Sequence, residues 1–325
     1  MSRRSLLAGF GGALSVGSPF AQSTQRPTPP GVLDAAWIDA TRQRRLPLRI
    51  RWPDGSGPHP LLLFSHGLGG SRLGGAVWGQ AWRAAGFVVI HLQHPGSDSA
   101  VWVQGHAALR AAATAEQLIA RVADVKFVLD EVQRRHADAG NEWARVRLDA
   151  IGVAGHSFGA QTVAALAGRR YPLDTGALAD DRPRAFMAFS PSLGRVKLSA
   201  AEAFDSVTRP FMVLTGSHDG DPFGAYADGG PRWKVFEGLP TGAKAGLWLD
   251  SADHFSFAGQ AELQQRMGLL GLRHDEAVRL QDRHHVLVAA ISTAWWQATL
   301  LGDEPAALRL KTPAGLARTD RWVTG

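Results

Sequence analysis

The sequence of 325 residues contains no cysteine. This absence excludes disulfide bonds, a thiol nucleophile and any metal site built on cysteine. Beyond the N-terminal segment, no run reaches the about 20 consecutive apolar residues that a membrane-spanning helix requires. Heptads and repeats with a period of about 20–50 residues are also absent, which excludes coiled coils and solenoid arrays.

A concentrated basic region is missing as well. The 35 lysines and arginines exceed the 29 acidic residues by six, but this excess is spread along the chain without a basic block. We therefore expect the charge to serve solubility, and we expect no nucleic-acid partner and no stable membrane insertion. With 45% hydrophobic residues, the chain can bury the core of one large α/β domain.

The first 21 residues are typical of an export signal. The sequence SRR at positions 2–4 resembles a twin-arginine pair, and it precedes a charge-free, glycine-rich and weakly apolar run over 6–21. The alternative is a disordered N-terminus on a cytosolic protein. Residues 22–31, QSTQRPTPPG, are polar and proline-rich, as in a linker. We therefore expect cleavage near the end of 1–21 and a periplasmic or secreted protein whose single domain spans 32–325.

From position 60 onward, short apolar runs alternate with longer segments of helical periodicity. Runs this apolar on both faces are typical of parallel strands that are covered by helices. Before them, Leu48, Ile50 and Trp52 alternate with arginines, as in an antiparallel strand. The sequence therefore predicts an α/β fold with a doubly wound, mostly parallel sheet and an antiparallel N-terminal start. The predicted parallel strands are 61–65, 86–91, 149–154, 185–190, 211–215 and 246–250, and the predicted helices include 116–135, 158–168 and 283–301.

One serine lies in a turn between the third predicted strand and a helix. The stretch GHSFG at 155–159 fits the pattern G-x-S-x-G, which in this context predicts a nucleophile elbow that exposes Ser157. Gly155 and Gly159 are expected where side chains would collide between strand and helix. The alternative is a glycine-rich turn with an incidental serine.

A serine hydroxyl is a weak nucleophile and needs a base that is oriented by an acid. In this kind of sheet, the acid and then the histidine follow later strands. The fifth predicted strand leads into GSHDGD, which offers Asp219 or Asp221, and the last leads into SADHFSF, which offers His254. We favour Asp219 because it comes first after its strand. Asp221, ahead of a proline, is expected to shape the turn, and Asp253 to form hydrogen bonds within its loop.

The other histidines are weaker candidates for the base because none directly follows the last strand. For His91 and His94 we favour a structural or rim role over metal binding, since no clear third ligand lies near them. We expect His156 to point away from the site, His66 to belong to the loop after the first strand, and His284 and His285 to lie within a helix.

The loop after the first strand, HGLGG at 66–70, can supply donors for an oxyanion. We expect the backbone N–H groups of Leu68 and of Phe158, the residue after Ser157, to form this pair. The alternative is a phosphate-binding turn, but the loop lacks the Lys-Ser/Thr pair of a P-loop and does not fit G-x-G-x-x-G.

Three motifs taken together resemble a known family. FSHGLGGSR, GHSFGA and TGSHD…LPTG…DSADHFSF are similar to bacterial α/β-hydrolases related to platelet-activating-factor acetylhydrolases and dienelactone hydrolases. The resemblance covers about residues 35–310 and implies the α/β-hydrolase fold. It also implies a nucleophile, acid and base at Ser157, Asp219 and His254, with Leu68 and Phe158 as oxyanion donors. The chain departs from dienelactone hydrolases in having no cysteine nucleophile. It departs from mammalian-type acetylhydrolases in having no carboxylate in FSPS, which follows the strand that carries their acid.

The leading functional hypothesis is therefore a serine hydrolase of carboxylic esters that needs no metal and no organic cofactor. Acyl transfer, amide cleavage, perhydrolysis and a non-catalytic binding protein on the same scaffold stay open as alternatives. We expect a small-molecule or lipid-like ester as substrate, while the sequence leaves the oligomeric state open. Segments 95–115, 170–184 and 220–240 are predicted to form the substrate pocket, with an aromatic set that serves either substrate binding or loop packing: Trp102, Tyr171, Phe223, Tyr226 and Trp233.

Overall fold

The computed structural model describes residues 31–138, 140–171, 178–194, 198–222, 224–269 and 271–325, with Trp102 and His106 as backbone only. The predicted export signal and all but the last residue of the predicted linker lie outside these residues. The described chain belongs to a compact unit that runs from Gly31 to Gly325.

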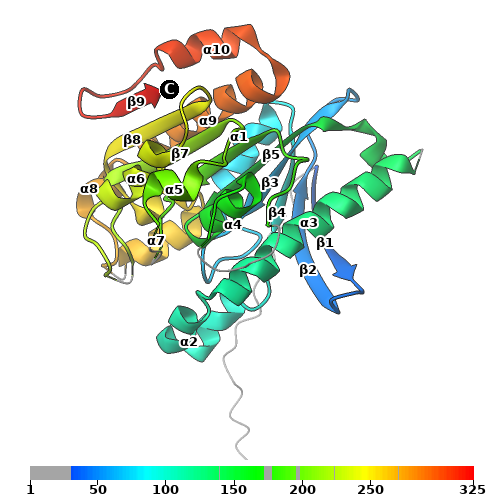
Figure 1. The fold of residues 1–325 in the computed structure, drawn as a ribbon, viewed down its shortest axis with the longest axis horizontal. Helices are drawn as coiled ribbons and strands as arrows, with labels where there is room; N and C mark the ends of the chain where they lie inside the picture. The colour runs from blue at the N-terminus through cyan, green and yellow to red at the C-terminus, as the bar shows by residue number, and fades with distance from the viewer. Residues whose placement is uncertain (1–30, 139, 172–177, 195–197, 223, 270) are drawn as a thin grey trace, which may run out of the picture. The chain divides into compact units, whose positions relative to one another are not determined.

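One sheet of nine strands passes through the described residues, in the order β1-β2-β4-β3-β5-β6-β7-β8-β9 (Figure 1). Pairing is parallel from β4 to β8 and antiparallel at both edges. The strands are β1 Val32–Asp39, β2 Arg44–Arg51, β3 His59–Ser65, β4 Val88–Leu92, β5 Val146–His156, β6 Ala185–Phe189, β7 Phe211–His218, β8 Lys244–Asp253 and β9 Arg321–Thr324.

The predicted mostly parallel sheet with an antiparallel N-terminal start is confirmed. All six apolar runs fall on β3 to β8, and β3 is buried along its whole length. The antiparallel start is a hairpin, in which Trp37 of β1 pairs with Leu46 of β2. The sequence predicts only the second strand of this hairpin, because exposed residues interrupt the apolar pattern of β1. It also missed the mostly exposed β9 at the other edge.

The helices and short 3-10 turns lie between the strands, beginning with α1 after β3. The three helices predicted by range correspond to α3, α4 and α9. The helices are α1 Ala76–Ala84, α2 His106–Ala111, α3 Ala115–Ala137, α4 Phe158–Ala167, α5 Ala200–Phe204, α6 Gly230–Gly238, α7 Ala261–Leu269, α8 Asp275–Arg279, α9 Gln281–Leu301 and α10 Glu304–Lys311, and the 3-10 turns are η1 Ser99–Gln104, η2 Glu142–Arg145 and η3 His254–Phe257.

Two hydrophobic cores cover the two faces of the sheet. Because side chains alternate along a strand, Leu61 and Leu63 of β3 enter one core while Leu62 and Phe64 enter the other. The first core is closed by α3, α4, α5 and α6, and the second by α1, α9 and α10. Figure 1 shows α3 and α4 in front of the sheet. This arrangement leaves the carboxyl ends of β3 to β8 to carry a site.

Helix α3 has a polar interruption in its buried stripe. The side chain of Thr114 accepts a hydrogen bond from the N–H of Gln117 and caps the helix, and Glu116 lies favourably in the first turn. Its buried face carries the expected apolar residues together with Arg121 and Asp124, both fully buried. Charged residues are rarely buried so completely unless they have partners, so these two require an explanation.

The chain between β4 and α3 forms a small lobe from η1 and α2. Val101, Leu109 and Ala112 make a core of their own, and Leu68 packs against it. Figure 1 shows α2 projecting from the body of the fold near the beginning of α3. The lobe therefore contacts the loop that follows β3.

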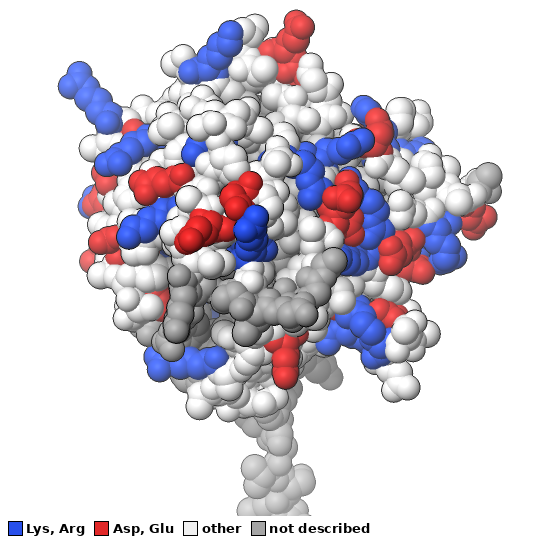
Figure 2. Space-filling model, in the orientation of Figure 1, with Lys and Arg blue, Asp and Glu red and all other residues white. Residues whose placement is uncertain are grey.

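On the face of the molecule that Figure 2 shows, basic and acidic side chains are interspersed. Arg182 is an example, since it pairs with both Asp130 and Asp180. Among the described residues, no helix is long and apolar enough to cross a membrane.

Candidate active site

Ser157 occupies a strained turn between β5 and α4. Its backbone has φ 56° and ψ −114°, a conformation that residues other than glycine rarely adopt. The N–H of Ser157 donates a hydrogen bond to the carbonyl of Phe189 at the end of the neighbouring strand β6. Strand, sharp turn and helix together form the elbow that the sequence predicted.

The two glycines of the elbow lie where backbones make close contact. A Cβ at Gly155 would stand 2.4 Å from the carbonyl oxygen of Gly159, and a Cβ at Gly159 would stand 1.9 Å from that of Ser65. Real Cβ atoms do not come so close, so any side chain would push α4 away from β5 and β3. The predicted reason for these glycines is confirmed.

The structure brings together the three predicted side chains of the site. His254 begins η3 after β8, and its Nε2 lies 3.0 Å from Oγ of Ser157. Its Nδ1 lies 2.9 Å from Oδ1 of Asp219, in the loop after β7. Because a carboxylate can only accept, Nδ1 carries the proton, and the unprotonated Nε2 accepts from the serine hydroxyl. All the groups of a serine, base and acid relay are in hydrogen-bond contact.

Asp219 is fully buried and has partners besides His254. The Thr215 hydroxyl donates to Oδ2 at 2.8 Å, and Nε of Arg232 lies 2.8 Å from Oδ1. Burial alone would raise the pKa of Asp219, but Arg232 and the hydrogen bond from His254 hold this pKa below its ordinary value. The carboxyl group is therefore ionised at neutral pH. The sequence gives no sign of this role for Arg232, which lies on α6 outside any local motif.

The two competing carboxylates lie elsewhere. Oδ2 of Asp221 accepts from the N–H of Ala225 and so shapes the turn, as predicted. Asp253 accepts from the N–H and hydroxyl of Ser256, which caps η3, and pairs with the buried Arg273. Asp253 thus fixes the loop that carries His254 rather than contacting the imidazole ring through a hydrogen bond.

The loop after β3 lies directly against Ser157. A Cβ at Gly67 would stand 3.0 Å from Nδ1 of His156 and 3.3 Å from Cβ of Ser157, so glycine makes this close approach possible without a shift of the neighbours. The carbonyl of Gly67 accepts from the N–H of Gly70 at 3.0 Å and faces Nδ1 of His66 at 2.6 Å. In a trans peptide the C=O and the following N–H point in opposite directions, so the N–H of Leu68 is directed away from these partners.

Two backbone donors are free at this position. No hydrogen bond between described residues uses the N–H of Leu68 or that of Phe158. Phe158 is the first residue of α4, where an N–H has no partner within the helix. Within the described residues, both N–H groups are therefore available as donors, one in the loop that lines the cavity and one directly after Ser157.

His156 corrects one expectation. We expected it to point away from the site, but its ring packs against that of His254, with 4.7 Å between the ring centroids. Its Nε2–H donates to the carbonyl of His254 at 3.0 Å. The reason is that the loop carrying His254 folds back over the elbow and meets the residue before Ser157. Burial lowers the pKa of His156 well below its ordinary value, so its ring is neutral.

His91 and His94 are buried rather than at a rim. His91 bonds through Nδ1 to the carbonyl of Gly74 and contacts Arg51, whereas His94 lies between Ser65 and Asp124. Among the described residues, no cluster of three or more His, Asp or Glu side chains is placed to hold a metal ion. His284 and His285 lie within α9, as expected.

A cavity of about 750 Å³ opens above Ser157 and His254. Its wall comes from the β3 loop, from α2 and from the segment around α7. Segment 95–115 therefore contributes as predicted and 220–240 contributes only Pro222, while none of the described residues of 170–184 lines the cavity. The lining side chains beyond the elbow and the β3 loop include Leu109, Arg110, Phe255, Leu263, Met267 and Leu272.

The aromatic set does not form this wall within the described residues. Tyr171 donates to the carbonyl of Gln161, Tyr226 lies over Arg232, and Trp233 packs on Phe236. These rings serve loop and core packing instead. Phe223 and the side chain of Trp102 lie outside the described residues. The sequence missed the wall from α7 because Leu263 and Met267 there look like ordinary helix-packing residues.

The comparisons with known proteins agree with the fold. A ferulic acid esterase from Streptomyces cinnamoneus has a similar structure, with a TM-score of 0.59 and 19% sequence identity over 84% of this chain and 90% of the other. No protein-family model matches the sequence, and no curated protein matches it. The chain has the α/β-hydrolase fold. At this identity the likeness concerns the fold alone.

Proposed function

We propose that this protein is a serine hydrolase that cleaves carboxylic esters through an acyl-enzyme intermediate. The observation that carries the proposal is the continuous hydrogen-bonded relay from Ser157 through His254 to Asp219 beside an open cavity. The motifs that resemble the acetylhydrolase and dienelactone hydrolase group support the same assignment, as does the esterase with a similar fold.

In the acylation step, Oγ of Ser157 attacks the ester carbonyl while Nε2 of His254 takes its proton. The carbonyl oxygen becomes an anion and accepts from the N–H groups of Leu68 and Phe158, at the positive end of the α4 dipole. Asp219 holds the imidazole in the correct tautomer and stabilises the imidazolium. The intermediate then collapses, the C–O bond to the alcohol breaks, and His254 gives its proton to the leaving oxygen.

Deacylation repeats these steps with water. Nε2 of His254 takes a proton from a water molecule, whose oxygen attacks the acyl carbon and forms a second oxyanion at the same donors. Collapse breaks the bond to Oγ of Ser157, which recovers its proton from His254, and the carboxylic acid leaves. The protein's own groups complete this cycle.

The cavity favours apolar ester groups. Leucine, methionine and phenylalanine side chains form much of its wall, with Arg110 as a charged member. The similar structure is a ferulic acid esterase, so hydroxycinnamoyl esters belong in a substrate screen beside short and long acyl chains. We propose a small-molecule or lipid-like ester as the substrate class.

A burst experiment tests the proposed function. Mixing the purified protein with a p-nitrophenyl ester should release a rapid burst of p-nitrophenol equal to the enzyme concentration, followed by steady turnover, because the activated ester acylates Ser157 faster than water hydrolyses the acyl-enzyme. Partition to an added alcohol or amine, or to peroxide, would indicate a transferase or a perhydrolase instead. Absence of both burst and turnover across aryl, acyl and amide substrates would contradict the proposal and favour a binding protein.

Arg232 leads to a prediction on pH. Burial and the nearby Arg232 lower the pKa of His254, while Asp219 raises it, and the net pKa lies below the ordinary value. The base works only when neutral, so activity falls as pH drops through this pKa. Replacing Arg232 with methionine removes a positive charge, makes protonation of His254 easier and raises its pKa. The acid limb of kcat/KM should therefore move to higher pH.

The pH profile of kcat/KM on one aryl ester measures this shift. Arg169 is a buried arginine whose hydrogen bonds go to Gln161, Ser192 and Leu193, so Arg169→Met is the matched control and should leave the acid limb in place. An acid limb that stays unchanged in Arg232→Met would show that Arg232 does not tune the base.

The export signal stays a prediction. It depends on SRR at 2–4 and the charge-free run that follows, and we propose a periplasmic or secreted location on this basis. The N-terminus of the protein recovered from outside the cytoplasm should start near residue 22.

A further inference from the structure

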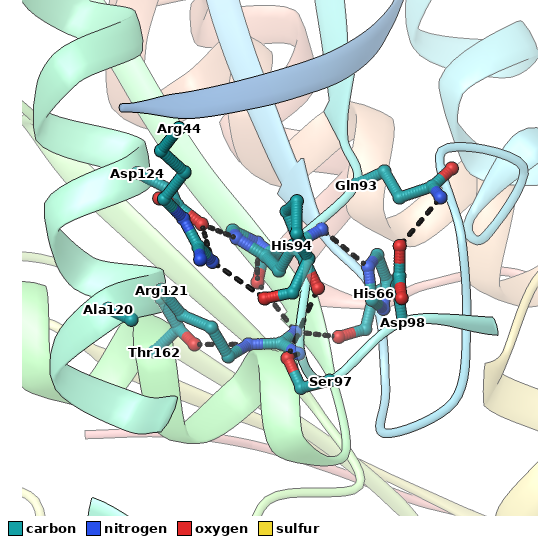
Figure 3. Close-up of polar contacts among 12 residues, drawn as sticks. Arg44, His66, Gln93, His94, Ser97, Asp98, Ala120, Arg121, Asp124 and Thr162 are labelled. Atoms are coloured by element: carbon teal, nitrogen blue, oxygen red, sulfur yellow. Dashed lines mark hydrogen bonds and ion pairs between the residues drawn. The ribbon is translucent and has the colours of Figure 1, made fainter. Parts of the chain in front are cut away.

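A buried polar cluster surrounds the end of β3 and the start of the loop that follows it. We call Ser65, His66, His94, Ser97, Arg121 and Asp124 the anchoring cluster. It joins the end of β3 to the segment after β4 and to helix α3 (Figure 3). All six residues are at least 95% buried. Only His66 among them lines the cavity, so the cluster does not itself receive substrate.

Arg121 is the centre of this cluster. Its guanidinium donates to the carbonyl of His66, to the hydroxyls of Ser65 and Ser97, and to the hydroxyl of Thr162 on α4 (Figure 3). The carbon of the same guanidinium lies 4.8 Å from the ring centroid of Phe158. A single side chain from α3 therefore contacts both elements that carry the free N–H groups beside Ser157.

The charge of Arg121 has no direct carboxylate partner among the described residues. Asp124 lies one turn further along α3, but it forms its ion pairs with Arg42 and Arg44 and accepts a hydrogen bond from the neutral His94. Burial lowers the pKa of Arg121 to about 9, so the guanidinium keeps its charge at neutral pH. Burying a cation without a directly paired anion is costly, so the hydrogen bonds that the guanidinium donates must compensate much of this cost.

Asp124 and His94 fix the direction of the remaining hydrogen bonds. Nδ1–H of His94 donates to Asp124 at 3.0 Å, so Nε2 is unprotonated and accepts from the Ser65 hydroxyl at 2.9 Å. This order of Ser, His and Asp matches that of a catalytic relay, but none of the three lines the cavity. We interpret it as a structural chain that holds the end of β3.

The same series of hydrogen bonds extends to the peptide bond between Gly67 and Leu68 in the β3 loop. The backbone N–H of His94 donates to Nε2 of His66 at 3.0 Å, which requires the proton of His66 to be on Nδ1. Nδ1–H then donates to the carbonyl of Gly67 at 2.6 Å. This fixes the peptide that carries the N–H of Leu68. Burial and Arg121 hold the pKa of His66 well below its ordinary value, so the ring stays neutral and keeps this donor pattern.

We propose that Arg121 is a positioning residue, which aligns the β3 loop and the start of α4 so that the N–H groups of Leu68 and Phe158 converge on the oxyanion. The proposal rests on the proposed ester hydrolase function. Arg121 contacts no substrate. It acts by holding the His66 carbonyl and the Phe158 ring, and by placing a fixed positive charge behind both donors.

The test compares Arg121→Met and Arg121→Lys with the parent on one aryl ester. Methionine removes the N–H donors of the guanidinium together with its charge. We expect kcat to fall by about 10²-fold, which is the usual loss when one oxyanion donor is removed, while KM stays within about threefold. Lysine keeps the charge but cannot reach every acceptor, and should lose about tenfold. Rates are normalised to the burst amplitude, so that unfolded molecules do not count.

A trifluoromethyl ketone supplies a readout that a merely structural role would not change. It forms an oxyanion on Ser157, so its inhibition constant should rise in parallel with the loss in kcat. The matched control is Arg209→Lys. Arg209 also donates to backbone carbonyls, including that of Leu166 near the far end of α4, and lies 4.8 Å from the Phe186 ring centroid. This control should keep both kcat and inhibition.

The outcomes separate the two proposals. An active parent with unchanged kcat and unchanged inhibition in Arg121→Lys would overturn the positioning role alone, even if Arg121→Met fails to fold. A change confined to KM or to burst amplitude would overturn it too. A parent with no burst and no reaction with the ketone would overturn the ester hydrolase function, and the positioning role with it.

Discussion

Replacing Ser157 with alanine should abolish ester hydrolysis, with a fall in kcat of about 10⁶-fold, which is typical of losing the nucleophile of a serine triad. The loss follows from the relay. Among the described residues, Ser157 carries the only hydroxyl that forms a hydrogen bond with Nε2 of His254. The fold should persist. Alanine is smaller than serine, and the backbone strain at φ 56° is similar for both residues. Steady-state rates and a thermal melt measure both expectations.

Ser251 offers the matched control. It is another serine with a positive φ, 60°, and it does not line the cavity. Ser251→Ala should keep the parental rate. Activity retained in Ser157→Ala at more than a trace level would contradict the assigned nucleophile.

The second large effect concerns the acid. Asp219→Asn keeps the volume but loses the charge, and the amide can hold the imidazole in the wrong tautomer, which in a serine triad lowers kcat by about 10⁴-fold. We expect a loss of at least about 10²-fold, because Arg232 and Thr215 keep the side chain in place. The measurement is kcat on one aryl ester.

Asp221→Asn is the control for this substitution, two residues away on the same loop. Its carboxylate accepts only a backbone N–H of its own turn among the described residues, so its loss should stay within about tenfold. A large loss of kcat in Asp221→Asn, together with an unchanged kcat in Asp219→Asn, would assign the acid to Asp221. An unchanged kcat in both variants would contradict the relay as a whole.

The fold could be predicted from the sequence because its signals are local. Short runs that are apolar on both faces mark β3 to β8, and a helical or loop segment follows each of these runs in the sequence. Strands β1 and β9 lie at the edges, where one face is exposed and the apolar pattern is weak. Edge strands are set by the neighbour they pair with, which a local pattern does not contain.

The positions of Ser157, Asp219 and His254 could also be predicted, because each directly follows a strand and the fold fixes their order. The residues around them could not. Arg121 and Asp124 lie in the apolar stripe of α3, and their spacing of three residues was the one available signal of a buried polar cluster. Arg232 is separated from Asp219 in sequence by the loop, and only tertiary packing shows that the two form an ion pair.

The predictions for the orientation of His156 and for the cavity wall were wrong for the same reason. Both depend on how η3 and α7 pack near the elbow and the cavity. No periodicity describes that path. The wall residues of α7 have the same chemistry as core residues, so composition does not distinguish them.

Reaction with a fluorophosphonate, followed by peptide mapping, tests whether Ser157 is an activated nucleophile. The reagent reacts with an activated serine and mimics the tetrahedral intermediate, so it requires the nucleophile, the base and the oxyanion donors together. We expect one adduct, on the peptide that carries Ser157, and none in Ser157→Ala. An adduct on another residue, or no adduct on the folded parent, would contradict it.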